Sequence, residues 1–276
     1  MLAQSLPLLA FPSLMTSLAD SSTNPSLECW IAQDGTQLAD WAYHFVRELL
    51  TGRSKQPAYI ALSGGTTPKR MYERMTKDPA DALVWQNAHW FVSDERNVPL
   101  DHPDSNFGLA ERILFQPAAV PRSLQHPVPI QMQAPTQAAE QYETMIANHL
   151  PRRVLGRPSF DLILLGLGDD AHTASLFPGT AALSEVNHNV VANYVPKLNT
   201  ARITFTAPLI NSASEVIFLV SGTNKTSALE QIWYGPPNFD QYPAQLIRGS
   251  KRLIWMVDRA ALGTLTPPAQ AKVVQS

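Results

Sequence analysis

The sequence predicts an α/β protein in which helices cover both faces of one mostly parallel sheet. Short, uniformly apolar runs alternate with segments of helical periodicity, which is the pattern of strands that are buried on both faces. Neither an internal repeat nor a linker interrupts this alternation, and 276 residues with 45% hydrophobic side chains can bury a sizeable core. We therefore expect a single Rossmann-like domain over residues 26–262.

The first helix has the clearest boundaries. Asp34 is a good N-cap, and Leu38, Trp41, Phe45 and Leu49 follow it with helical spacing. Apolar runs predict strands at residues 29–32, 58–62, 89–93, 160–165, 190–192, 202–206, 216–220 and 253–257. Further helices are expected at residues 68–75, 105–115, 136–150 and 224–233.

The two ends of the chain are expected to be tails. Residues 1–25 are mildly apolar, but they lack the basic residues of a secretory or transit signal, and Pro7 and Pro12 interrupt them. Residues 263–276 are polar and contain prolines, which is typical of a C-terminal tail. We expect a cytoplasmic protein.

Charge and composition exclude several classes of protein. The net charge of −2 and the pI near 6.4 give no bulk electrostatic reason to bind nucleic acid or an anionic membrane. No stretch reaches the ~20 consecutive apolar residues of a membrane helix. The single cysteine, Cys29, excludes an internal disulfide framework and a cysteine-rich metal cluster.

The residues that follow each strand are the candidates for a binding site, because ligands of open parallel sheets lie beyond the carboxyl ends of the strands. Ser63, Gly64, Gly65 and Thr66 follow one strand and precede a helix near Pro68. Exposed N–H groups and the helix dipole would suit a phosphate there. The segment matches neither GxGxxG nor GK[ST], and taken alone it could be an ordinary strand-to-helix turn.

Two further segments carry ionisable side chains. Asp94-Glu95-Arg96 follows the strand at 89–93, and Asn106 comes shortly after it. Burying these charged side chains is costly unless they pair with one another or with a ligand. If they are not buried, the segment is an ordinary solvated loop. Asp170 and His172 lie in the glycine-rich loop after residues 160–165.

Histidine suits proton transfer near neutral pH, and Asp170 could fix the tautomer of His172. No HxH or HExxH spacing surrounds this histidine, so no metal site is expected. Arg202 and Lys225 lie at strand or helix boundaries, where they could neutralise a phosphate together with Arg96; either could equally be an ordinary surface cation.

In their order along the chain, these segments resemble the 6-phosphogluconolactonase family, part of a fold group that also holds glucosamine-6-phosphate deaminase and ribose-5-phosphate isomerase. The stretches that carry the resemblance are 62–68, 93–96, 105–106, 166–179, Arg202 with Thr204, and Gly222 with Lys225. One departure is Ala171, where the family usually has glycine. A positive φ at that position would strain an alanine.

The resemblance implies hydrolysis of 6-phospho-D-glucono-1,5-lactone to 6-phospho-D-gluconate in the pentose phosphate pathway, without a cofactor. In this interpretation His172 is the general base for water, assisted by Asp170, and Arg96 or loop N–H groups bind the oxyanion. The residues expected to hold the phosphate are Ser63, Gly64, Gly65, Thr66, Arg202 and Lys225. Asp94 and Asn106 are expected as further substrate contacts. We expect a small-molecule substrate and a monomer or weak dimer.

Three alternatives compete with this interpretation. The deaminase–isomerase branch has an acidic residue five places after the histidine, where this chain has Phe177, although Asp94 could still act as an enolising base. A non-catalytic sugar-phosphate sensor would have less reason to keep both Asp170 and His172. Ser175 is disfavoured as a nucleophile because its neighbours lack the G-x-S-x-G pattern.

Overall fold

The computed structural model describes residues 25–53 and 56–275, so nearly all of the expected N-terminal tail lies outside the described residues. A seven-stranded sheet forms the centre, in the order β12-β1-β11-β10-β7-β2-β3, and every neighbouring pair in it is parallel. Its strands are β1 (Ser26–Ala32), β2 (Ala58–Leu62), β3 (Ala88–Val92), β7 (Leu162–Leu165), β10 (Glu215–Val220), β11 (Arg252–Asp258) and β12 (Lys272–Gln275). The predicted parallel α/β fold is confirmed.

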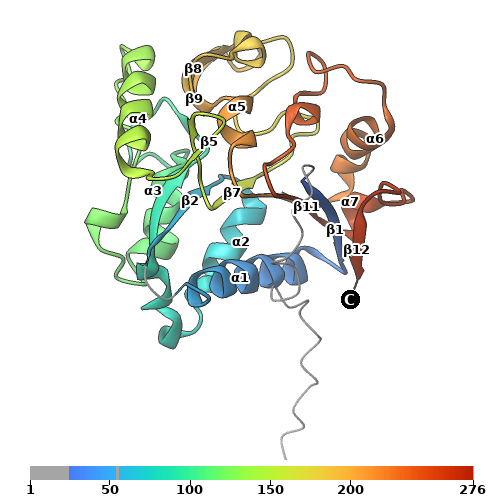
Figure 1. The fold of residues 1–276 in the computed structure, drawn as a ribbon, viewed down its shortest axis with the longest axis horizontal. Helices are drawn as coiled ribbons and strands as arrows, with labels where there is room; N and C mark the ends of the chain where they lie inside the picture. Colours follow the sequence, from blue (N-terminus) through green and yellow to red (C-terminus); the bar gives the residue numbers. More distant parts are fainter. Residues whose placement is uncertain (1–24, 54–55, 276) are drawn as a thin grey trace, which may run out of the picture.

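Helices cover both faces of this sheet (Figure 1). On one face lie α1 (Gly35–Thr51) and α2 (Thr66–Met75). On the other lie α4 (Pro135–His149), α5 (Ala207–Asn211) and α6 (Thr226–Tyr234). Because the strands are covered twice, all four residues of β7 are buried, which explains the uniformly apolar runs in the sequence.

The predicted cap of the first helix is present. The side chain of Asp34 accepts hydrogen bonds from the backbone N–H groups of Thr36 and Gln37, at 2.8 and 2.9 Å. Trp41 and Phe45, on the apolar side of α1, pack edge-on against Trp30 of β1, with ring centroids 6.2 and 5.9 Å away. The helical periodicity therefore identified the surface that α1 turns toward the sheet.

A second, smaller sheet differs from the expected arrangement. It consists of β4 (Asp94–Arg96), β9 (Thr200–Phe205) and β8 (Val190–Val195), and both of its pairings are antiparallel. The sequence predicts the strands now seen as β8 and β9 but not their separation from the main sheet, and residues 94–96 were expected as a loop. They are extended because they pair with β9, a contact between segments about a hundred residues apart that no local pattern reveals.

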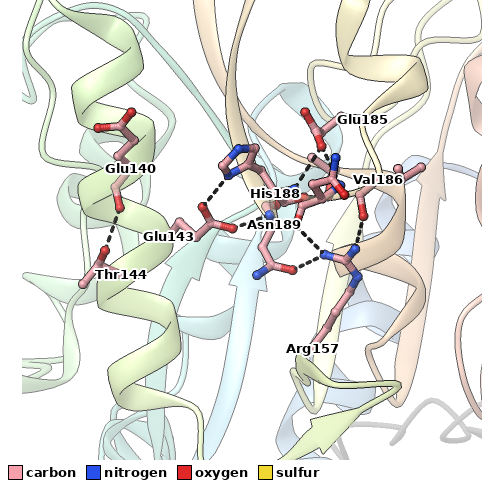
Figure 2. Close-up of polar contacts among 10 residues, drawn as sticks. Glu140, Glu143, Thr144, Arg157, Glu185, Val186, His188 and Asn189 are labelled. Atoms are coloured by element: carbon pink, nitrogen blue, oxygen red, sulfur yellow. Dashed lines mark hydrogen bonds and ion pairs between the residues drawn. The ribbon is translucent and has the colours of Figure 1, made fainter.

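Polar contacts anchor the small sheet to its surroundings (Figure 2). Glu143 on α4 accepts hydrogen bonds from His188 Nδ1, at 3.2 Å, and from the backbone N–H of Asn189. Arg157, in β6 (Arg157–Pro158), donates to Asn189 Oδ1 at 2.7 Å and to the carbonyl of Val186. Because β8 begins directly after these residues, α4 and the hairpin of β5 (Arg153–Val154) and β6 set its starting position.

The C-terminal segment also differs from expectation. Residues 272–275, placed by the sequence in a polar tail, form strand β12 and pair in parallel with β1. This strand lies at the edge of the sheet and stays largely exposed, so it lacks the apolar run that marks the central strands. Among the described residues, none of the helices combines the length and the apolar character needed to span a membrane.

Candidate active site

The candidate site lies at the point where the strand order of the main sheet reverses. The chain crosses from β1 to β2, continues outward to β3, and then returns to β7 on the other side of β2. The connections after β2 and β7 therefore leave in opposite directions and open a crevice at the carboxyl ends of these strands. A cavity of about 380 Å³ lies there.

This cavity brings together nearly all the predicted site residues, although they come from six separate stretches of the chain. Those that line it are Ser63, Gly64, Gly65, Asp94, Arg96, Asn106, Asp170, His172, Arg202 and Lys225. Thr66 does not line the cavity and is the first residue of α2. The cavity also receives residues that the sequence did not single out, chiefly Lys197 and Leu198.

The glycine turn after β2 is closely packed. Gly65 has φ +99°, a conformation that favours glycine, and is the N-cap of α2. Because glycine has no side chain, no side-chain cap accepts from the first N–H groups of the helix. A β-carbon on Gly64 would lie 1.8 Å from Asn106 Oδ1, so only glycine fits there. Tyr72 Oη stabilises the turn by donating to the carbonyl of Ser63 at 2.6 Å. The turn therefore presents backbone to the cavity at a helix N-terminus.

Two arginines enter the cavity side by side. The register of β4 and β9 places Arg96 directly opposite Arg202. Like charges in that position oppose strand pairing, and within the described ranges neither guanidinium forms an ion pair with a carboxylate. Nε of Arg202 is buried without a hydrogen-bond partner, and burial, followed by the charge of Arg96, lowers the pKa of Arg202. Together the two guanidinium groups form a cationic site suited to an anion.

Asp94 and Glu95 have different roles. Asp94 lines the cavity and accepts a hydrogen bond from Ser175 Oγ at 2.6 Å. Glu95 is buried and accepts from Ser105 Oγ and from the backbone N–H groups that begin α3 (Asn106–Ala110). Burial raises the pKa of Glu95, while these hydrogen bonds oppose the rise. Glu95 thus holds Asn106 in place. Ser175 donates to Asp94 instead of to His172, and in the described part of the chain no hydrogen bond joins Ser175 to His172.

The loop after β7 holds the imidazole on two sides. His172 Nδ1 lies 2.5 Å from Asp170 Oδ1, and Phe177 stacks on the ring with centroids 4.0 Å apart. The hydrogen bond from His172 holds the pKa of Asp170 well below its usual range. An ionised Asp170 fixes the proton on Nδ1, which leaves Nε2 as a base. Gly168 makes this approach possible, because a β-carbon there would lie 2.1 Å from His172 Nδ1.

Ala171 has the conformation that the sequence raised as a concern. Its φ is +62°, in the left-handed region that costs a residue with a β-carbon ~1–2 kcal/mol. The loop nevertheless keeps the His172–Asp170 hydrogen bond. The backbone strain is therefore accommodated without separating the two side chains.

Lys197 is the residue that sequence reasoning missed. Its Nζ lies 3.0 Å from Asp170 Oδ2. It stands in a short 3₁₀ turn, Pro196–Leu198, 27 residues after Asp170, with no motif of its own. Only the pairing of β8 with β9, which returns this turn to the histidine loop, could have identified it. In the described ranges, no group of three or more His, Cys, Asp or Glu side chains is arranged to hold a metal ion.

Comparisons with known proteins agree with one another. A family described as "Glucosamine-6-phosphate isomerases/6-phosphogluconolactonase" matches residues 33–255. A 6-phosphogluconolactonase of Synechocystis sp. is 43% identical over 208 residues, covering 75% of this chain and 85% of that protein. One from Nostoc sp. is 41% identical over 202 residues, covering 73% and 82%. The solved structure of 6-phosphogluconolactonase from Trypanosoma cruzi superposes with a TM-score of 0.77 at 29% identity, covering 89% of this chain and 98% of that one.

Proposed function

The chain belongs to the family of glucosamine-6-phosphate isomerases and 6-phosphogluconolactonases and is an enzyme of the 6-phosphogluconolactonase kind; we propose that it hydrolyses 6-phospho-D-glucono-1,5-lactone with His172 as general base. The observation that carries the proposal is the composition of a single cavity. One part holds a carboxylate-oriented imidazole, and another holds Arg96 and Arg202 without carboxylate partners. Such a cavity combines a base for water with a binding site for a phosphorylated substrate.

The phosphate end of the substrate binds where the positive charge and the free amides gather. Gly64 and Gly65 offer backbone at the N-terminus of α2, and Arg202 and Lys225 supply charge. The phosphate takes no part in the reaction, but its binding fixes the lactone ring relative to the histidine loop. Orientation of this type converts remote binding energy into rate.

Hydrolysis then needs a base that takes a proton from water and later gives it to the leaving ring oxygen. His172 Nε2 takes a proton from water as the water oxygen forms a bond to the lactone carbonyl carbon. The resulting tetrahedral oxyanion is stabilised by Arg96 or by loop N–H groups, each worth typically ~3–4 kcal/mol. When the bond between that carbon and the ring oxygen breaks, the imidazolium returns the proton to the ring oxygen. Water has then been added across the ester, and the enzyme is unchanged.

The contact between Phe177 and His172 favours this chemistry over sugar-phosphate deamination. Position 177 corresponds to the place where the deaminase branch is expected, from the resemblance, to carry an acid, and here an apolar ring stacks on the imidazole instead. The carboxylate of Asp94, the other candidate for an enolising base, accepts hydrogen bonds from Ser175 Oγ at 2.6 Å and from Asn106 Nδ2 at 3.4 Å. An imidazole paired with one carboxylate is sufficient for a lactone, which is an activated ester.

The decisive experiment compares three substrates with the purified chain. We expect acid release from 6-phospho-D-glucono-1,5-lactone well above the spontaneous rate, a much higher KM for unphosphorylated glucono-1,5-lactone, and no ammonia from glucosamine 6-phosphate. Ammonia release without lactone hydrolysis would assign the chain to the deaminase branch. Binding of 6-phosphogluconate without turnover would instead make it a sugar-phosphate sensor.

A further inference from the structure

Asp170 is bound at both of its oxygens. Oδ1 lies 2.5 Å from His172 Nδ1, and Oδ2 lies 3.0 Å from Lys197 Nζ. The carboxylate is therefore shared between the imidazole and a cation from a different part of the fold. Lys197 and His172 both line the cavity, and Asp170 connects their side chains.

We propose that Lys197 is a positioning residue, which acts on His172 through Asp170; this inference rests on the proposed function. A carboxylate held at one oxygen can still rotate about its last side-chain bond. A second donor at Oδ2 limits that freedom and keeps Oδ1 within hydrogen-bond distance of His172 Nδ1. The hydrogen bond from Lys197 also helps to hold the pKa of Asp170 well below its usual range, after the larger contribution of His172.

The charge of Lys197 has a second consequence for the base. An isolated carboxylate beside an imidazole favours the protonated ring, which cannot accept a proton from water. A cation on the far oxygen offsets part of that negative charge. Lys197 therefore balances part of the negative charge beside the ring that acts as general base.

The fold holds Lys197 at a defined point. Its 3₁₀ turn ends at Asn199, which has φ +47°, and Tyr194 Oη donates to Asn199 Oδ1 at 2.5 Å. The Lys197 side chain itself is 66% exposed, so its ion pair adds little to folding stability. Replacing this lysine should consequently change the chemistry of the site while leaving the protein folded.

The test is a double-mutant cycle with a matched pair of lysine variants. We expect Lys197→Met to lower kcat by about 1.5- to 5-fold, the range of a partly exposed charge pair, with KM nearly unchanged. Lys197→Arg should retain most of the activity, because it keeps a cation next to Asp170. In the Asp170→Asn background, Lys197→Met should have no further effect. Lys251→Met, an exposed residue directly before β11 and outside the cavity, serves as the control and should match wild type.

Three results would overturn the inference. A rise in KM at constant kcat would make Lys197 a substrate contact, and an equal loss in both backgrounds would show that it does not act through Asp170. A readout independent of turnover separates these from failure of the proposed function. Nitrogen NMR of the His172 ring at a fixed pH should show a weaker hydrogen bond at Nδ1 in Lys197→Met than in wild type, and identical spectra would refute the inference. Absence of lactone hydrolysis by the wild type would refute the proposed function alone.

Discussion

Gly168 allows a quantitative test of the histidine loop. A β-carbon at this position would lie 2.1 Å from His172 Nδ1 and 2.6 Å from Asp170 Oδ1. Ordinary contact begins at 3.4 Å, so Gly168→Ala must displace the imidazole by roughly 1.3 Å (3.4 minus 2.1). A misplacement of ~1 Å in a catalytic site can cost ~10²-fold in rate. We therefore expect kcat/KM for the phosphorylated lactone to fall by about that factor.

Backbone strain does not complicate this prediction. Gly168 is not among the glycines with positive φ, so alanine can adopt its backbone conformation. The matched control is Gly166→Ala in the same loop, whose β-carbon would meet only Ser63 Oγ, at an ordinary 3.7 Å. Steady-state hydrolysis and thermal melting should show a large loss of activity for Gly168→Ala alone, with both proteins folded. Wild-type kcat/KM in folded Gly168→Ala would refute the close approach of His172 and Asp170.

Three further predictions concern the base, the cations and the pH dependence of stability. We expect His172→Ala to lower kcat/KM by at least ~10²-fold with little change in the Kd for 6-phosphogluconate measured by calorimetry; undiminished turnover would remove His172 from the mechanism. Arg202→Ala and Lys225→Ala should raise KM for the phosphorylated lactone but not for glucono-1,5-lactone, and equal effects on both substrates would contradict a phosphate site. Burial raises the pKa of Glu215 to about 7, above its unfolded value, so its favourable contribution to folding is full below pH 4.5 and is lost as the pH rises through 7. Melting experiments should accordingly show the Tm of Glu215→Gln gaining on that of wild type between pH 4.5 and about 7, whereas a constant difference would show that Glu215 does not titrate there.

Local sequence patterns were sufficient to predict most strands of the main sheet and the loops that follow them. Asp34, the glycine turn at Gly64 and Gly65, and the loop of His172 each signal themselves by spacing or residue type within a few positions. The sequence also predicted that these loops lie close together, because the carboxyl ends of parallel strands meet at one edge of a sheet. Nearly all the predicted site residues consequently line one cavity.

Pairing between distant segments could not be predicted in the same way. Strand β4 is three residues long and highly charged, and it is extended only because β9 lies beside it. That pairing brings Arg96 to Arg202, and the turn between β8 and β9 brings Lys197 to Asp170. The short, exposed β12 was missed for a related reason, since its structure depends on β1 rather than on its own sequence.

The facing guanidinium groups of Arg96 and Arg202 also affect the choice of solution conditions. Their mutual repulsion is relieved by any small anion that fits between them, whether or not it resembles a sugar. Inorganic phosphate or sulfate would then compete with substrate and raise the melting temperature, since a ligand that binds only the folded form stabilises it. Kinetic constants measured in phosphate buffer would include this competition, whereas a zwitterionic buffer at low ionic strength would report the affinity of the free cavity.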